Sequence, residues 1–159
     1  MNREEFIAHI RGEQEQLRRF LLALCLGNRD EADDIAQESL VKAYLSSSGY
    51  QDKGKFTSWL YRIAHHTFLD HMKSCKSMQP LDTAYDIADS SMSADRSFRY
   101  QELYAALDTL PPKERSSILL FYIKGYSVKE ICLITDSSED AVKKQLSRGR
   151  EHLKTKLER

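Results

Sequence analysis

The chain has 159 residues, of which 41% are hydrophobic, enough for one ordinary domain or two small ones with a packed core. Basic and acidic residues number 24 each, and a net charge of zero argues against a protein that binds DNA tightly on its own. Three widely spaced cysteines form no CxxC pair, which argues against a disulfide framework.

The chain begins with a charged segment, MNREEFIAHI, that lacks the apolar run of a signal peptide. No window of the sequence approaches the length of a membrane span. We therefore expect a soluble, cytoplasmic protein with no direct membrane insertion. Apolar residues then recur at helical spacing, which predicts a first helix from Arg3 to Cys25 that ends at Gly27.

Two more helices are predicted before residue 75. Asn28 can cap the second helix, with Glu31 at the position of a capping box, and the pattern runs to about Leu45 with Tyr44 on the inner side. The third helix starts near Thr57 or Ser58. Its stripe of apolar residues is the densest in the chain, so it should form the core of a first domain, and it contains Phe56, Trp59, Leu60, Ile63, Ala64, Thr67 and Phe68.

The stretch from Ser74 to Ser97 holds six serines and four aspartates and shows no sustained helical pattern, so it reads as a tether. After it, one helix ends at Pro111-Pro112 and another runs from Lys113 to Lys124, before Gly125. We therefore expect an all-α fold of two small helical domains, residues 1–74 and 99–159, joined by a flexible linker at 75–98. The net charge of the last segment is +3, against −1 and −2 for the other two.

Residues 126–150 predict two short helices joined by a tight turn. Ser127 and Glu130 form a capping box for the first helix, and Ser137 or Ser138 can cap the second. The second helix has an apolar stripe formed by Val142, Leu146, Gly149, Leu153 and Leu157. The other side is basic and carries Lys143, Lys144, Ser147 and Arg148, followed by Arg150. This layout is typical of a helix-turn-helix that reads the DNA major groove, although a basic face can also be merely solvated.

The second predicted helix carries an acidic outer face. Asp30 and Glu31 lie in the first turn, where acids suit the helix dipole. The remaining polar and acidic residues extend past that turn beside one apolar residue, and they are Asp33, Asp34, Gln37, Glu38 and Val41. An acidic face of this kind is a plausible docking surface for a basic partner.

Aromatic and basic residues alternate around the third predicted helix, a pattern that suits single-stranded DNA because bases stack on rings while cations meet phosphates. Phe56 and Trp59 are interpreted as core residues. The candidates for DNA contact are Tyr50, Lys53, Lys55, Tyr61, Arg62, His65, His66 and Lys73, which we expect to point away from the core or to lie beside those that do.

A histidine cluster on the same helix suggests a metal site as an alternative. His66 and Asp70 share a face, whereas His71 should point to the core side. No HExxH, CxxC or second acidic cluster supplies further ligands, and no glycine-rich phosphate loop is present. We therefore expect no metal and no cofactor, and a metal-dependent hydrolase stays a minor alternative.

Three segments together resemble a known family. DEADDIAQESLVKAY (30–44) resembles the polymerase-binding segment of bacterial sigma factors, and KFTSWLYRIAHHTFLDHMK (55–73) resembles their promoter-melting and −10 recognition segment. The run from LDTLPPKERSSILLFYIKGYSVKEI through VKKQLSRGREHLK resembles their −35 recognition domain. With two helical domains and only a linker between them, the chain resembles the extracytoplasmic-function (ECF) subgroup of the sigma-70 family.

The resemblance implies a role for each surface. The acidic face would dock on the β′ clamp helices of core RNA polymerase, the third helix would capture an unpaired −10 base, and the basic helix would read the −35 element. The resemblance also implies three other partners: the β flap of polymerase, promoter DNA, and an anti-sigma factor that is either soluble or membrane-bound. Family members often carry Arg-Asn where this chain has His65-His66, a departure that bears on the −10 contacts and not on the fold.

The resemblance also implies a path and a role for the linker. The linker would run towards the RNA exit path, where its aspartates mimic nucleic-acid charge. In the free protein it would let one domain fold against the other and hide either the polymerase-docking helix or the −35 helix. The rival interpretation is a free-standing helix-turn-helix transcriptional regulator with an N-terminal sensing or dimerising domain, which would bind its promoter without polymerase.

Overall fold

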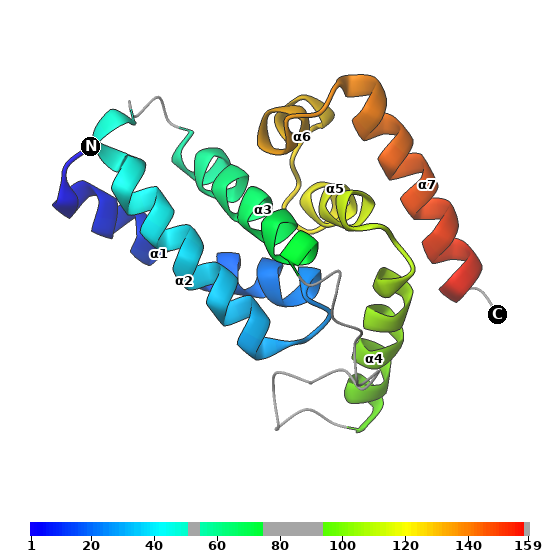
Figure 1. Ribbon diagram of the computed structural model, residues 1–159. Helices are drawn as coiled ribbons and strands as arrows, with labels where there is room; N and C mark the ends of the chain where they lie inside the picture. Colours follow the sequence, from blue (N-terminus) through cyan, green and yellow to red (C-terminus); the bar gives the residue numbers. More distant parts are fainter. Residues whose placement is uncertain (51–54, 75–93, 158–159) are drawn as a thin grey trace.

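The computed structural model describes residues 1–50, 55–74 and 94–157, and within these ranges the regular structure is helical (Figure 1). The elements are α1 (Arg3–Leu24), α2 (Arg29–Ser46), a 3-10 turn η1 (Ser47–Gly49), α3 (Phe56–Ser74), α4 (Ala94–Asp108), α5 (Pro112–Tyr122), α6 (Val128–Thr135) and α7 (Glu139–Leu157). The predicted all-α class is confirmed. None of the helices in the described ranges is long and apolar enough to cross a membrane.

The helix starts follow from local capping. The Asn2 side chain accepts from the backbone N–H of Glu5, whose carboxylate accepts from the backbone N–H of Asn2 in return. Asn28 accepts from the N–H of Glu31 at the start of α2, as predicted. Between these helices, Leu26 and Gly27 adopt positive φ angles of 59° and 86°, which turn the chain out of α1.

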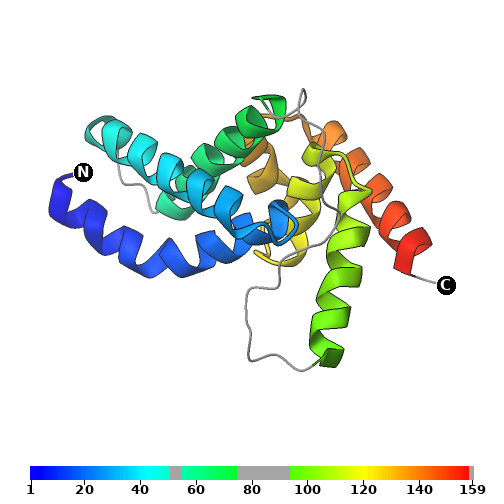
Figure 2. The ribbon, with the colours of Figure 1, turned by 60° about the horizontal axis from the view of Figure 1, so that its bottom comes forward.

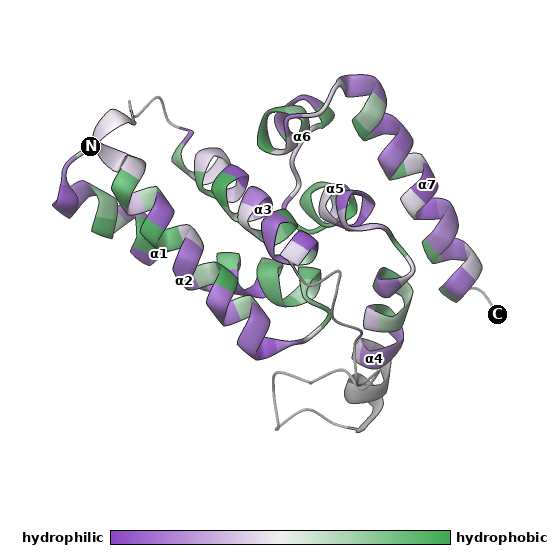
Figure 3. Cartoon of the chain, viewed as in Figure 1, coloured by the Kyte–Doolittle hydropathy of each residue, from purple (hydrophilic) through white to green (hydrophobic). Residues whose placement is uncertain are grey.

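Helices α1, α2 and α3 form the first unit, and their facing sides bury the largest apolar residues. Leu17, Phe20, Ile35, Leu60 and Phe68 are all at most 1% exposed. In Figure 3 hydrophobic positions lie where these helices face one another, and hydrophilic ones lie on their outer sides. The dense stripe of α3 therefore does form the core that the sequence predicted.

Helices α4 to α7 form the second unit, in which α5 and α7 pack very closely. A Cβ atom added to Gly149 would lie 2.6 Å from Cγ1 of Ile118, so only glycine permits this approach. Val142 and Leu146 complete the buried stripe of α7. The predicted stripe is too long at its end, because Leu157 is 49% exposed where α7 has passed its neighbours.

The turn between α6 and α7 follows the predicted capping pattern. Both hydrogen bonds of the Ser127–Glu130 box are present at the start of α6. Asp136 ends α6 in the left-handed conformation, with a φ of 54°. Ser138 accepts from the N–H of Ala141, so Ser138 rather than Ser137 caps α7.

The two units are packed against each other (Figures 1 and 2). Helix α6 lies along α3, and α5 contacts both α1 and α3. Buried apolar residues of both units form one continuous core. The expectation that one unit can fold against the other is therefore confirmed. Helix α4 begins at Ala94, inside the predicted linker 75–98, whose residues 75–93 lie outside the described ranges.

Candidate functional site

The acidic face of α2 is open to solvent. The residues predicted to form it, which are Asp33, Asp34, Gln37, Glu38 and Val41, are all exposed. At the end of the helix Tyr44 and Leu45 are 47% and 73% exposed, which extends the face with apolar surface. Tyr44 was predicted to lie inside. Instead only the edge of its ring packs on Phe6, with ring centroids 5.5 Å apart, because α1 covers one side of it.

Glu38 is held by two basic side chains on the edge of this face. His71 Nε2 lies 2.7 Å from its Oε2, and Lys42 Nζ lies 3.3 Å from its Oε1. The hydrogen bond with His71, supported by Lys42, holds the pKa of Glu38 below its usual range. His71 thus bridges α3 to α2 at the surface, and the prediction that it points to the core side is wrong.

The beginning of α3 carries an aromatic cluster. The rings of Tyr50 and Trp59 stack with centroids 4.5 Å apart, and both residues are partly buried. Lys55 and Lys73 are exposed at the two ends of the helix. Trp59 therefore lies at the margin of the core rather than inside it. Lys53 lies outside the described residues.

Two of the predicted DNA contacts on α3 are buried, which corrects the expectation that they face away from the core. Tyr61 is fully buried, with Lys124 Nζ 4.9 Å from the centre of its ring. His65 is 1% exposed, and its Nδ1 lies 3.0 Å from the hydroxyl oxygen of Ser116 on α5. Burial lowers the pKa of His65 to about 4 and raises that of the Tyr61 phenol. Ser116 of the second unit covers His65, whereas Tyr61 lies between Phe20 of the first unit and Tyr126 of the second, with ring centroids 5.1 and 6.1 Å away.

Arg62 and His66 face the turn of the helix-turn-helix. The Arg62 Nη1 donates to Asp136 Oδ1 over 2.5 Å and to the carbonyl oxygen of Leu133 over 2.8 Å. His66 Nε2 lies 3.1 Å from the other oxygen of the same carboxylate, Asp136 Oδ2. The bond from Arg62 is the main cause that lowers the pKa of Asp136.

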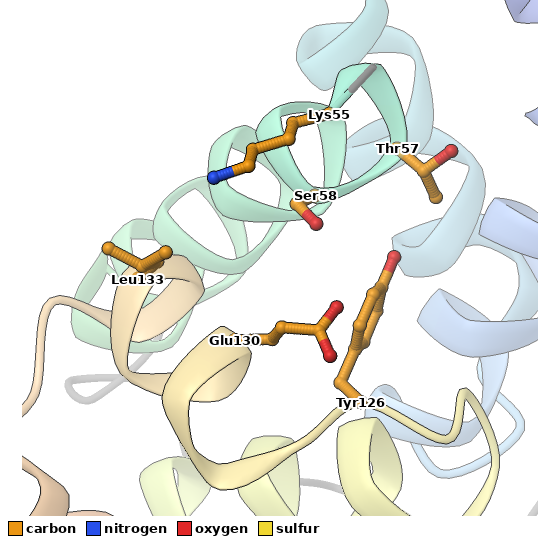
Figure 4. Close-up of a pocket in the computed structure, with 6 residues that line it drawn as sticks. All are labelled: Lys55, Thr57, Ser58, Tyr126, Glu130 and Leu133. Carbon is orange, nitrogen blue, oxygen red and sulfur yellow. The ribbon is translucent and has the colours of Figure 1, made fainter. Parts of the chain in front are cut away.

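The contact between the two units is called the seam. A small recess lies in it, between the start of α3 and α6 (Figure 4). It has a volume of about 270 Å³ and is lined by Lys55, Thr57, Ser58, Tyr126, Glu130 and Leu133. Burial raises the pKa of the Tyr126 phenol to about 12, while the Ser58 side chain acts in the opposite direction. One cation, one anion and three hydroxyls do not make an acid–base or nucleophile constellation.

The histidine cluster of α3 is split among three different neighbours. His65 faces Ser116, His66 faces Asp136, and His71 faces Glu38. Among the residues that the structure describes, no three His, Cys, Asp or Glu side chains come together as metal ligands would. The arrangement serves contacts between helices.

The basic face of α7 is exposed on the side opposite its buried stripe. Its residues are Lys143, Lys144, Ser147 and Arg148, all accessible to solvent, and α7 is mostly hydrophilic in Figure 3. Arg150 is also exposed but is directed elsewhere, because its Nη1 donates to the Tyr122 hydroxyl over 3.0 Å. Four of the five predicted residues thus share one open face.

The sequence did not point to the residues that join the two units. Arg115, Ser116, Lys124 and Asp136 all make contacts across the seam. The only available signal was an acidic residue at the point where α6 must stop, and it was interpreted simply as part of a turn.

Comparisons with known proteins agree with this architecture. Residues 9–77 match the family described as Sigma-70 region 2, and residues 100–153 match Sigma-70, region 4. The ECF RNA polymerase sigma factor SigW of Bacillus subtilis (strain 168) is 34% identical over 146 residues, which cover 83% of this chain and 78% of that protein. EcfG of Rhodopseudomonas palustris (strain TIE-1), another ECF RNA polymerase sigma factor, is 29% identical, with coverage of 89% and 78%.

Solved structures show the same fold. The sigma factor RpoE in complex with the anti-sigma factor NepR from Bartonella quintana superposes with a TM-score of 0.80 at 22% identity, over 97% of both chains. CnrH in complex with the cytosolic domain of CnrY gives a TM-score of 0.72, also at 22% identity, over 98% of this chain and 89% of that one. With both sigma regions in order, and with a relative this similar over most of both chains, the protein belongs to the ECF RNA polymerase sigma factors, which bind core RNA polymerase and direct transcription initiation at promoters.

Proposed function

We propose that three surfaces divide the work of this sigma factor. The acidic face of α2 docks on the β′ clamp helices of core polymerase, α3 captures the −10 element, and the basic face of α7 reads the −35 element. The observation that carries the proposal is that the α2 and α7 faces are both solvent-exposed and lie on opposite sides of the molecule (Figure 1). One protein can then hold polymerase and DNA at the same time.

The α2 face suits a basic protein partner because its carboxylates are clustered around exposed apolar residues. Val41 and Leu45 are 58% and 73% exposed, and they can be buried by a partner while Asp34 and Glu38 pair with its cations. The ion pair of Asp33 with Arg18, at 3.2 Å, already uses one carboxylate inside the chain. Glu38 is likewise engaged inside the chain, by His71 and Lys42, so we assign the strongest contribution to Asp34.

The α7 face suits the major groove because its side chains project from one stripe of an exposed helix. Lys143, Lys144, Ser147 and Arg148 are free to reach base edges and phosphates. Arg150 supports α7 through Tyr122 and would touch a flanking phosphate at most. Membership of the sigma-factor family implies the β flap of polymerase as a further contact of the protein.

The −10 role of α3 requires the second unit to move. Lys55 and Lys73 are exposed and Tyr50 is half-buried when the two units are packed together, whereas Tyr61 and His65 are buried. Arg62 and His66 are engaged by Asp136. We infer that polymerase binding separates the units and uncovers these four residues for unpaired DNA.

We also propose where the protein acts and how it is controlled. It acts in the cytoplasm, catalyses no reaction itself, needs no cofactor, and is held inactive by an anti-sigma factor, as RpoE is bound by NepR and CnrH by the cytosolic domain of CnrY in the two solved complexes. The test is reconstitution with purified core RNA polymerase. Promoter-dependent transcription should appear only with polymerase and this chain together. A chain that bound and opened its promoter without polymerase would instead be the free-standing regulator.

A further inference from the structure

At the rim of the contact between the two units, basic side chains of one unit face an acidic side chain of the other. Arg62 and His66 of α3 approach a single carboxylate, that of Asp136, which projects from the turn between α6 and α7. Arg62 reaches the same turn a second time through the carbonyl oxygen of Leu133. The exposed fractions of the Arg62 and Asp136 side chains are 43% and 53%, so the pair lies at the rim of the seam, where competing solutes can reach it.

The turn itself does not require an acid at position 136. The residue has a φ of 54°, a left-handed conformation that glycine or asparagine adopts with less cost than most other residues. What the aspartate adds is a negative charge aimed at α3. The local backbone therefore explains a small polar residue here, and the contact with Arg62 and His66 explains the charge.

A carboxylate and a DNA phosphate are alternative partners for the same guanidinium. Both present anionic oxygens that accept charged hydrogen bonds from arginine. Arg62 and His66 are among the residues proposed to contact DNA at the −10 element. While Asp136 holds them, a phosphate meets an occupied site and an extra negative charge beside it.

In this packed arrangement of the two units, called the closed form, the second unit covers the side of α3 that carries Tyr61 and His65. His65 is sealed by Ser116, and Tyr61 is sealed by the segment that carries Lys124. The acidic face of α2 and the basic face of α7 stay exposed. The expectation that closure hides the docking helix or the −35 helix is therefore not met, and the part of the −10 surface that carries Tyr61 and His65 is the one that is covered.

We propose that Asp136 is an autoinhibitory latch, which occupies Arg62 and His66 in the free protein in the place of a −10 DNA phosphate and is released when polymerase draws the two units apart. The latch rests on the proposed −10 role of Arg62 and His66. It leaves the polymerase-docking face free, so the enzyme can bind the closed form first and then open it.

The test compares Asp136→Asn with Asp140→Asn in the full chain. Asparagine keeps the shape and tolerates the left-handed turn, while Asp140 is an exposed acid in the same helix-turn-helix that makes no contact with α3 in the structure. Both variants lose one negative charge, so any general gain in DNA affinity is the same in both.

Opening is measured without DNA. Ser116→Cys, buried in the seam, is introduced into every variant after the native cysteines are replaced by alanine or serine, and its reaction with iodoacetamide reports the open fraction. Asp136→Asn should react about threefold to tenfold faster than Asp140→Asn, as expected for the loss of a half-exposed charged pair worth about one kcal/mol. Equal rates in the two variants would overturn the latch.

Binding is measured with a fluorescein-labelled oligothymidylate, because phosphate contacts need no particular sequence. A larger open fraction lowers the apparent Kd in proportion, so Asp136→Asn should bind about threefold to tenfold more tightly than Asp140→Asn. The double variant Arg62→Gln/Asp136→Asn should open as readily and lose that gain. If it opens and keeps the gain, Asp136 holds the two units closed but does not take the place of a phosphate at Arg62, and the proposed DNA contact of Arg62 is wrong.

A folding control keeps the test decisive. Circular dichroism should show the same helical content for all variants. If Asp136→Asn loses helix, Arg62→Gln breaks the same pair from α3, and its labelling rate should rise by the same factor over wild type. A labelling rate equal to that of wild type in a folded Arg62→Gln variant would also refute the latch.

Discussion

The Arg115 guanidinium on α5 donates from Nη1 to the carbonyl oxygen of Leu24, the last residue of α1, over 2.7 Å. Its Nε and Nη2 donate to the carbonyl oxygens of Leu107 and Leu110, at 3.1 and 3.2 Å, where α4 ends. The last carbonyls of a helix, such as that of Leu24, have no partner within it, and Arg115 supplies one. The Leu110 carbonyl follows the end of α4, while that of Leu107 also accepts from the backbone N–H of Leu110 over 3.0 Å. Because Arg115 is 6% exposed, this contact ties the two units together from inside.

We expect Arg115→Met to lower the free energy of unfolding by about 2–4 kcal/mol, because methionine fills similar space but leaves buried carbonyls unpaired. The measurement is urea unfolding followed by circular dichroism. Arg11→Met, at an exposed position of α1, is the matched control and should change the free energy of unfolding by less than about 0.5 kcal/mol. Equal losses in the two variants would mean that the hydrogen bonds of Arg115 add nothing.

Charge reversal on α2 tests polymerase docking. Asp34→Lys/Glu38→Lys should weaken binding to core polymerase by about tenfold or more, because two carboxylates in one docking face are replaced by cations that repel a basic partner. The measurement is competition for core polymerase against labelled wild-type chain. Glu4→Lys/Glu102→Lys reverses two exposed acids elsewhere and should bind as wild type does. Unchanged affinity in the Asp34/Glu38 variant, with the fold intact, would rule this face out.

The basic face of α7 should separate base contact from phosphate contact. We expect Arg148→Ala to cost about 1–3 kcal/mol in holoenzyme binding if its guanidinium meets a guanine, with relaxed preference at one position of the −35 element. A phosphate contact would weaken all sequences alike and reduce the salt slope by about one. Arg150→Ala should matter less for DNA, because its guanidinium is bonded to Tyr122. Binding is measured on a set of −35 variants at several salt concentrations.

The sequence predicted the parts of this molecule that are encoded locally. Capping by Asn28, Ser127 and Ser138 and the buried positions Val142 and Leu146 depend on residues three or four positions apart. Such patterns fix the helices and which side of each faces a core. The α2 and α7 surfaces were identified for the same reason, since each lies on one helix.

What the sequence could not supply is the partner that covers each face. Tyr61 and His65 were expected to face away from the core of the first unit. His65 is buried because α5 packs on it, and Tyr61 is buried between Phe20 of α1 and the segment before α6. A contact across more than 50 residues, such as that of His65 with Ser116, leaves no periodic signal. The same holds for Asp136, whose local role as a helix stop gives no sign of its contact with Arg62.

His65 gives the closed molecule a dependence on pH. It is 1% exposed, and burial, followed by the nearby positive charges of His66 and Lys113, lowers its pKa to about 4, against 6.5 for an ordinary histidine, while Asp136 acts in the opposite direction. The unfolded chain therefore binds a proton more readily than the folded one between these two values. Stability from the neutral imidazole is fully present above pH 6.5 and falls as the pH drops towards 4.

We expect this loss to reach about 3 kcal/mol, from a pKa difference of about 2.5 at roughly 1.36 kcal/mol each. The measurement is the free energy of unfolding of wild type and His65→Gln between neutral pH and pH 4. Glutamine can still bond to Ser116 but cannot be protonated, so the difference between the two curves isolates the imidazole. A His65→Gln curve parallel to that of wild type would show that His65 is accessible to protons in the free protein, and that α5 does not seal it against α3.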